Sequence, residues 1–430
     1  MSTVFLKFTE GCCWRRVIDV KIIERYFLRN NWKVSINPEN ADVIIIETCA
    51  FVKRTEDIAI EEIRAVVGRN YHGRLIITGC LPGINLERLR KYFSGAAVNT
   101  AQLEKLNELF PEFDHKLSLF DDTTELFTQK DLQSTGMTLK SILHYLADNF
   151  TLNPGYWMRL AGNIRRVLWS GMGLKRNTLR FLRIAWGCPE PHCTFCVEWK
   201  AVGSTVISKP ADIVLREVKD NLAEGVTRFA VIADSPATWG SDIGSDFTAL
   251  LSSVLEVDRR IVLANLDGFH PRWLIRHQEK FLQLLRSGRI RSLMSALQSG
   301  NNRILKLMNR QYTREEYLSL MKSIRRVCPE IVLITQIIVG FPSETFEEFR
   351  ESVDLVIACR CTNVTLFPFY SNPLTPAAGM EGMINDAEKF RRIDYALKRL
   401  GSKGILSFNM GVEINPKYQE TKALYDNQQF

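Results

Sequence analysis

The stretch RFLRIAWGCPEPHCTFC, at residues 180–196, is the most informative part of the sequence. It begins with Arg180–Ala185, the first of the strands that alternate with helices from this point on. Cys188, Cys193 and Cys196 follow this segment within a span of nine residues. Three cysteine thiolates at such spacing can bind three irons of a cubane 4Fe–4S cluster. The stretch therefore predicts a strand that ends at a metal centre.

The missing fourth ligand determines the predicted chemistry of this centre. No other cysteine lies near Cys196, so the fourth iron would stay open for the amino and carboxylate groups of S-adenosylmethionine (SAM). Cleavage of SAM would release a 5′-deoxyadenosyl radical, which can remove hydrogen from an unactivated carbon. No amino-acid side chain can carry out this step. A zinc site with His192 as fourth ligand is the alternative. However, His192 directly precedes Cys193, and adjacent residues rarely point into one tetrahedral site.

Strand and helix patterns alternate from residue 180 to residue 369. Pro210 is expected at an early position inside a helix, and the segments 313–316 and 345–348 fit the capping box. Six β/α units in sequence predict an α/β fold, an open partial (β/α)6 barrel whose chemistry comes from the loops after its strands. A last helix is expected at 386–400. The predicted strands are Arg180–Ala185, Phe229–Asp234, Arg260–Asn265, Ser292–Leu297, Ile331–Phe341 and Asn363–Phe369.

The first 99 residues predict a small parallel sheet of Rossmann- or flavodoxin-like type. Apolar strands at 4–8, 42–47 and 75–78 alternate with helical patterns at 17–29, 54–67 and 85–93. Cys12, Cys49 and Cys80 each follow one of these strands. Because the carboxyl ends of parallel strands line one edge of a sheet, we predict a second metal cluster there. Cys13 fits the spacing as well as Cys12 does, and buried free thiols are the alternative to a cluster.

Composition and charge restrict the function only weakly. The 430 residues carry a net charge of +8. This charge would favour an anionic partner, but it is modest for a chain of this length. No apolar stretch is long enough to span a bilayer, and we find no secretory signal. Ten cysteines in such a chain predict metal ligands rather than disulfides, and a cytoplasmic location. The four cysteines outside the two groups are predicted to be buried structural thiols: Cys13, Cys328, Cys359 and Cys361.

A mainly helical insertion is predicted between the two α/β regions. Its second half, 151–183, has seven Lys or Arg residues, no acid, and interleaved aromatic and aliphatic residues. A solvated helical face packed on a neighbour is the simpler interpretation, and a surface for an acidic peptide, RNA or lipid headgroups is the other. The predicted domains are an N-terminal cluster domain at 1–99, the insertion at 100–179, the barrel at 180–380, and a C-terminal helix and tail at 381–430.

The sequence resembles the methylthiotransferase family of radical-SAM enzymes, which thiomethylate tRNA adenosine or a ribosomal-protein aspartate. The similarity covers residues 1–95 and 178–380. The matching segments are Glu10–Cys12, Ala41–Ala50, Thr78–Cys80, Gln298–Gly300, Ile304–Arg310, Tyr312–Tyr317, Ile337–Thr345 and Thr375–Ala378.

The resemblance implies the roles of both cysteine groups. Cys188, Cys193 and Cys196 would hold the SAM cluster, and Cys12, Cys49 and Cys80 an auxiliary 4Fe–4S cluster whose open iron delivers sulfur. Asp234 and Ser235 would lie where the family contacts the methionine amine, and Gln298 and Gly340 where it contacts SAM. An electron donor such as flavodoxin or ferredoxin is implied as a partner.

The sequence also departs from the family pattern. Four residues separate Cys188 from Cys193 where the family has three. Met294 and Ala296 replace a His and a Pro, and Gln336 replaces an Asp. The segment 370–375 is one residue shorter than usual, and the usual C-terminal RNA-binding barrel is not expected. These differences put the familiar substrates in doubt.

Three functional hypotheses follow from these observations. The first is a sulfur-inserting radical-SAM enzyme that acts on a peptide or small metabolite, as in specialised metabolism. The second is a tRNA methylthiotransferase in which the basic segment Arg159–Arg183 replaces the RNA-binding module. The third is a non-catalytic metal-binding protein derived from such enzymes.

Overall fold

The computed structural model describes residues 2–69, 71–120, 179–190 and 193–409. They belong to two compact units, which we treat separately. Of the described residues, the first unit takes in those up to 120, those from 179 to 261, and 372–375, and the second takes in 262–371 and 376–409. The domain boundaries expected from the sequence stay a prediction.

The N-terminal part of the first unit is a parallel sheet with the order β2-β1-β3-β4-β5. Its central strand β3 is buried at every residue, as the run of β-branched residues predicts. The three strands expected from the sequence are confirmed. The two others are only three and four residues long, too short to give a periodic signal. The strands are β1 (Thr3–Phe8), β2 (Lys33–Ser35), β3 (Val43–Thr48), β4 (Arg74–Gly79) and β5 (Ala96–Asn99).

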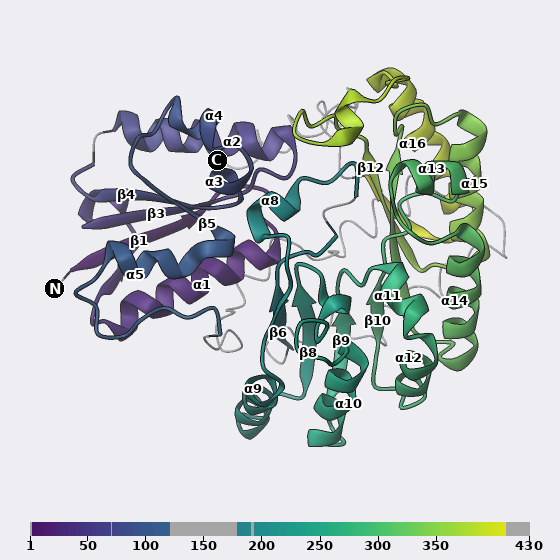
Figure 1. Cartoon of the computed structure of the whole chain (residues 1–430), viewed down its shortest axis with the longest axis horizontal. Helices are drawn as coiled ribbons and strands as arrows, with labels where there is room; N and C mark the ends of the chain where they lie inside the picture. The colour runs from purple at the N-terminus through teal and green to yellow at the C-terminus, as the bar shows by residue number, and fades with distance from the viewer. Residues whose placement is uncertain (1, 70, 121–178, 191–192, 410–430) are drawn as a thin grey trace, which may run out of the picture. The chain divides into compact units, whose positions relative to one another are not determined.

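Helices cover both faces of this sheet (Figure 1). The helices α1 and α5 lie on one face, and α2 and α4 lie on the other. Isoleucine and alanine side chains of α2 pack on β3 and β4 in the hydrophobic core between them. The helices are α1 (Trp14–Arg29), α2 (Lys53–Gly68), α3 (Cys80–Ile84), α4 (Leu86–Arg90) and α5 (Leu106–Leu109).

The first unit also contains the elements between residues 179 and 261. β6 and β8 pair in parallel, and β7 pairs with β6 in antiparallel orientation. Pro210 is the residue just before α9 rather than inside its first turn. The elements are β6 (Leu179–Trp186), α8 (Glu198–Val202), β7 (Ile207–Ser208), α9 (Ala211–Ala223), β8 (Arg228–Ala233) and α10 (Phe247–Val257).

The second unit continues the alternation of strands and helices. Its strands pair in parallel in the order β9-β10-β11-β12-β13. Thr313 and Thr345 form the expected capping boxes with Glu316 and Glu348. The strands are β9 (Val262–Leu266), β10 (Ser292–Met294), β11 (Val332–Val339), β12 (Asn363–Pro368) and β13 (Leu406–Asn409). The helices are α11 (Pro271–Arg276), α12 (Gln278–Leu285), α13 (Asn302–Leu307), α14 (Arg314–Val327), α15 (Phe346–Ala358) and α16 (Asp386–Gly401).

The fold class and all six predicted strands after residue 178 are confirmed. β13 lies in the segment that we expected to be a tail, and its four residues follow the long helix α16. Most of the predicted helical insertion, including most of its basic segment, lies outside the described residues. Within the part of the chain that the structure describes, no helix combines the length and apolar character needed to cross a membrane.

Candidate metal and SAM sites

The first cysteine group lies at the carboxyl edge of the N-terminal sheet. The register pairs Phe8 of β1 with Glu47 of β3, and Thr48 of β3 with Gly79 of β4. The three strands therefore end almost level with one another. Cys49 and Cys80 directly follow two of these ends, and Cys12 follows the third after a short loop. The predicted juxtaposition is thus produced by strand register.

Hydrogen bonds hold the loops of this edge in place. The Thr9 hydroxyl lies 3.5 Å from the Cys12 sulfur and accepts the Cys49 backbone N–H at 3.4 Å. The Thr48 hydroxyl donates to the Thr78 carbonyl at 2.6 Å and accepts the Leu81 N–H, which anchors the start of α3. The positions of all three cysteines are therefore set by buried threonines.

Gly79 permits the close approach of β3 to the start of α3. Its φ is +100°, and a Cβ atom there would lie 2.3 Å from the Thr48 carbonyl oxygen. Only glycine fits this combination of backbone angle and contact. The side chain of Cys80 is consequently turned into the protein, where it is buried.

The thiols of the first group interact electrostatically in a buried environment. Burial raises the pKa of Cys12, and the charge of Cys49 raises it further. Burial also raises the pKa of Cys80, whereas the nearby Arg16 guanidinium lowers it. Binding of a metal must therefore displace protons from these thiols. Because the donors are sulfur atoms that can meet at one place, they fit an iron–sulfur cluster.

Cys13 differs from the other thiols at this edge. It caps the amino end of α1 and its side chain is exposed, so the prediction that it is a buried thiol is wrong. Its charge still acts on Cys49 and Cys80. Cys328, Cys359 and Cys361 are buried, as predicted, and all ten cysteines are free of disulfides.

The second cysteine group occupies the loop between β6 and α8. Gly187 starts this loop with φ +80°, and a Cβ atom there would lie 1.9 Å from the Thr205 carbonyl oxygen. Cys188 donates its N–H to Gly203, and Cys196 donates its own to Cys193. The Cys196 sulfur accepts the Glu198 N–H at 3.4 Å. The loop is therefore folded back on itself by its own backbone.

The charges of this group are mutually coupled as well. Burial raises the pKa of Cys188 to about 12, and Cys193 contributes to the rise. Burial raises the pKa of Cys196 too, with contributions from Glu198 and the other two thiols. The three thiols therefore lie within electrostatic range of one another, as ligands of one cluster must.

The two cysteine groups border the same hydrophobic cluster inside the first unit. This cluster contains Cys80 with Leu81 and Ile84 of α3, together with Ala201 and Val202 of α8. Cys188 packs against it from the second loop. The structure therefore brings together two groups that lie about a hundred residues apart in the chain.

A network of buried charges connects the two loops. Arg16 of α1 is within 2.9 Å of Asp19 and 3.4 Å of Asp234, and Arg183 of β6 also pairs with both carboxylates. These four side chains are at most 1% exposed. The neighbouring Arg15 pairs with Glu198 at 3.2 Å. Carboxylates and guanidinium groups alternate in this network, which offsets the cost of burying them.

Asp234 belongs to this network, and Ser235 lies beside it. Asp234 accepts the Gly187 N–H at 3.0 Å through its second oxygen. This side chain thus links the carboxyl end of β8 to the second cysteine loop. Ser235 is buried, and its carbonyl accepts from Thr238. That these two residues lie where the methionine amine of SAM is bound remains a prediction.

Gln298 and Gly340 both follow strands of the second unit. Gln298 has φ +67° and bridges to Ile337, and its buried Oε1 atom has no hydrogen-bond partner among the residues that the structure describes. Such an acceptor suits a residue that faces a ligand. Gly340 has φ +78°, and its N–H donates to Glu344 at 2.9 Å. Strain and an unsatisfied polar atom therefore mark the predicted SAM-binding edge of this unit.

Within the described ranges, no three His, Cys, Asp or Glu side chains converge closely enough to hold one metal ion. Three thiolates around a cubane cluster bind three different irons, so they lie farther apart than the ligands of one ion. His192, the proposed fourth ligand of the zinc alternative, lies outside the described residues.

Sequence reasoning missed the buried charge network. Two signals were present: the Arg15-Arg16 pair, separated from Cys12-Cys13 only by Trp14, and Arg183 between the apolar residues Leu182 and Ile184 of a predicted strand. A charged residue in a buried strand is rare unless it is paired. The partners of Arg183, however, are Asp19 and Asp234, which lie 164 and 51 residues away in the chain and are identified only by the fold.

Two protein-family models match parts of this chain, and several known proteins are similar to it. The model of the radical SAM superfamily matches residues 184–356, and that of the uncharacterized protein family UPF0004 matches residues 5–100. The chain is similar to the ribosomal protein uS12 methylthiotransferase RimO of Carboxydothermus hydrogenoformans, with 27% identity over 86% of this chain and 76% of that protein. It is equally similar to the tRNA-2-methylthio-N(6)-dimethylallyladenosine synthase of Pelotomaculum thermopropionicum, with 27% identity over 84% and 74%.

Among solved structures, the chain resembles the radical SAM methyltransferase TsrM of Kitasatospora setae. The TM-score is 0.59 at 15% identity, and the alignment covers 88% of this chain and 77% of that protein. At this identity the likeness concerns the fold alone.

Proposed function

Because the chain belongs to the radical-SAM methylthiotransferase family, we propose that it forms a carbon–sulfur bond at an unactivated carbon of a peptide or small metabolite. Its relatives are methylthiotransferases, so the chain is an enzyme of this kind rather than a non-catalytic metal-binding protein. Radical-SAM enzymes use SAM and a 4Fe–4S cluster. The site assignments, the second cluster and the substrate class are parts of the proposal.

The juxtaposition of the two cysteine groups is the observation that carries this proposal. Cys80 and Cys188 border one hydrophobic cluster, and the Arg16–Asp234 pair connects their loops. We assign one cluster to Cys188, Cys193 and Cys196, and the other to Cys12, Cys49 and Cys80. When bound, SAM and the first cluster would supply the radical that removes hydrogen from the substrate, and the second cluster would supply sulfur.

The remaining residues would position these groups. Arg16 places a positive charge beside Cys80 and so favours the thiolate form of that ligand. Asp234 fixes the backbone of Gly187, the residue before Cys188. Gln298 would use its unsatisfied amide oxygen as an acceptor for SAM. An electron donor such as flavodoxin or ferredoxin would act as partner, and free thiols suit a cytoplasmic location.

Relatives with two kinds of substrate motivate two candidate substrates. The Carboxydothermus relative is a ribosomal protein methylthiotransferase, which supports a peptide substrate for this chain. The Pelotomaculum relative, named for a tRNA base, is equally similar. A tRNA methylthiotransferase is therefore the second candidate.

Product analysis tests both the chemistry and the substrate. The protein is reconstituted anaerobically with iron and ³⁴S-sulfide, reduced, and incubated with SAM and a cell extract. We expect 5′-deoxyadenosine and ³⁴S in the peptide or small-metabolite fraction, both lost in Cys188→Ala and both retained in the control Cys328→Ala. Label confined to tRNA nucleosides would replace the first substrate with the second. Absence of 5′-deoxyadenosine would contradict the proposed chemistry.

A further inference from the structure

A basic pocket lies in the second unit, away from the strand ends that carry Gln298 and Gly340. It has a volume of about 370 Å³ and is formed by the last turns of α14, the end of α15 and the turn that follows. These segments precede β11 and β12, whereas Gly340 follows β11. The pocket is therefore at the amino edge of the parallel strands, opposite the predicted catalytic edge. Its lining residues are Lys322, Arg325, Arg326, Ala358, Cys359 and Arg360.

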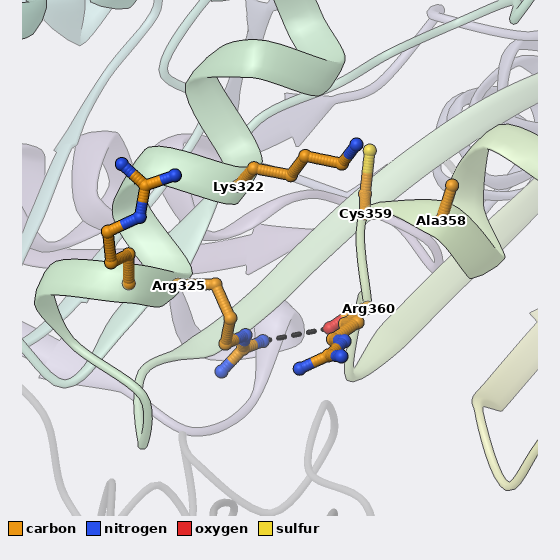
Figure 2. Close-up of a pocket in the computed structure, with 6 residues that line it drawn as sticks. Lys322, Arg325, Ala358, Cys359 and Arg360 are labelled. Atoms are coloured by element: carbon orange, nitrogen blue, oxygen red, sulfur yellow. Dashed lines mark hydrogen bonds between the residues drawn. The ribbon is translucent and has the colours of Figure 1, made fainter.

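Arg325 and Arg360 give this pocket a fixed wall (Figure 2). The Arg325 guanidinium donates to the carbonyls of Pro329 and Ile331 at 2.7 Å and to that of Arg360 at 2.8 Å. Arg360 lies two residues after the end of α15 and has φ +51°. Its N–H donates to the Ile357 carbonyl. These three carbonyls hold the Arg325 guanidinium in position.

The positive charge of the pocket comes from its other three basic side chains. Lys322, Arg326 and Arg360 are exposed, and none of them pairs with a carboxylate among the residues that the structure describes. No Asp or Glu lines the pocket. Three like charges around one cavity repel one another, and an anion would relieve this repulsion.

The only thiol in the lining does not neutralise these cations. A hydrogen bond with Cys361 and burial both raise the pKa of Cys359, so its side chain stays neutral near pH 7. The Lys322 amine extends toward this sulfur (Figure 2). The ionic side chains that line the cavity are therefore all basic.

We propose that this pocket binds the phosphate groups of a phosphorylated small molecule. Guanidinium groups match phosphate oxygens in geometry and charge, and a lysine adds a mobile positive charge. The volume is in the range of small-molecule sites. No aromatic ring lines the pocket, so it lacks the stacking surfaces with which proteins hold single-stranded RNA. These features favour a compact phosphate compound over RNA.

Calorimetric titration of the full chain with inorganic pyrophosphate tests this assignment. We expect saturable one-site binding in low salt, weakened at least tenfold in the triple variant Lys322→Ala, Arg326→Ala, Arg360→Asn. Asparagine is used at 360 because it tolerates a positive φ. The control is Arg350→Ala, Arg391→Ala, Lys398→Ala, which removes the same charge from exposed positions in the same unit. Its affinity should stay within twofold of wild type.

Three results would overturn the proposal. One is the absence of saturable pyrophosphate binding, and another is an equal loss of affinity in both triple variants, which would reduce the effect to net charge. The third is binding of tRNA that depends on the three cations and is not displaced by pyrophosphate. That result would make the pocket part of an RNA surface. Because the measurement uses no SAM and no cluster, it is independent of the proposed reaction.

Discussion

Replacing Gly187 by alanine should disrupt the second cysteine loop. The position has φ +80°, and the added Cβ atom would lie 1.9 Å from the Thr205 carbonyl oxygen. The left-handed backbone costs an alanine about 1 kcal/mol. Relief of the overlap requires the loop or Thr205 to move by more than 1 Å, at a further cost of ~2 kcal/mol. We therefore expect a loss of about 3 kcal/mol in unfolding free energy.

Gly225 provides the matched control for this substitution. It lies in the same unit with φ +86°, and nothing lies within 4 Å of an added Cβ atom. Gly225→Ala should therefore lose only the backbone term of about 1 kcal/mol. The assay is urea denaturation of both variants before reconstitution, followed by an iron count after it. Gly187→Ala should also lose the irons of the cluster that we propose for Cys188, Cys193 and Cys196, because the loop that presents these thiols is displaced.

Equal stability of the two variants, within about 0.5 kcal/mol, would refute the claim that close packing at Gly187 fixes the loop. A stable Gly187→Ala protein with full iron content would have the same consequence. Loss of stability with full iron content would show that the loop re-forms around the cluster, and would separate packing from metal binding.

Further predictions concern buried charges and helix caps. Arg183→Met should lower the unfolding free energy by ~3–5 kcal/mol because it leaves Asp19 buried without that partner; denaturant titration checks this, and a loss below 1 kcal/mol would contradict it. Burial raises the pKa of Glu344 to about 7. The folded state therefore binds the extra proton, and its stabilising effect, about 3 kcal/mol at most, is complete below pH 4.5 and lost as the pH rises to about 7. Unfolding midpoints of wild type and Glu344→Gln should diverge over that interval, and parallel pH profiles would exclude the effect. Thr313→Ala should cost about 1 kcal/mol because it removes the cap of α14; thermal unfolding measures this, and an unchanged midpoint would argue against the cap.

The main strands and the cysteine edge could be predicted because their signals are local. A continuous apolar run such as that of β3 specifies a buried strand wherever it is placed, and a cysteine directly after it must lie at the strand end. Three such cysteines meet because the sheet is parallel and its strands end level. Strand order and register were not needed for that inference, and they agree with it.

The elements and contacts that were missed depend on distant partners. β2 and β5 are short edge strands that gain their hydrogen bonds from β1 and β4. Arg183 requires Asp19 from α1 and Asp234 from the end of β8, and no local pattern pairs these residues. We expected Cys13 to be buried because of its residue type alone. It occupies the N-cap position of α1, and its side chain is exposed.

The proposed sulfur transfer requires two clusters, and an iron and sulfide count tests this requirement directly. Wild type and a variant with Cys12, Cys49 and Cys80 all changed to alanine are reconstituted anaerobically and compared. Two cubane clusters predict about eight irons per wild-type chain and about four in the variant. About four irons in both proteins would mean that the first domain holds no cluster, and would contradict the proposed sulfur carrier.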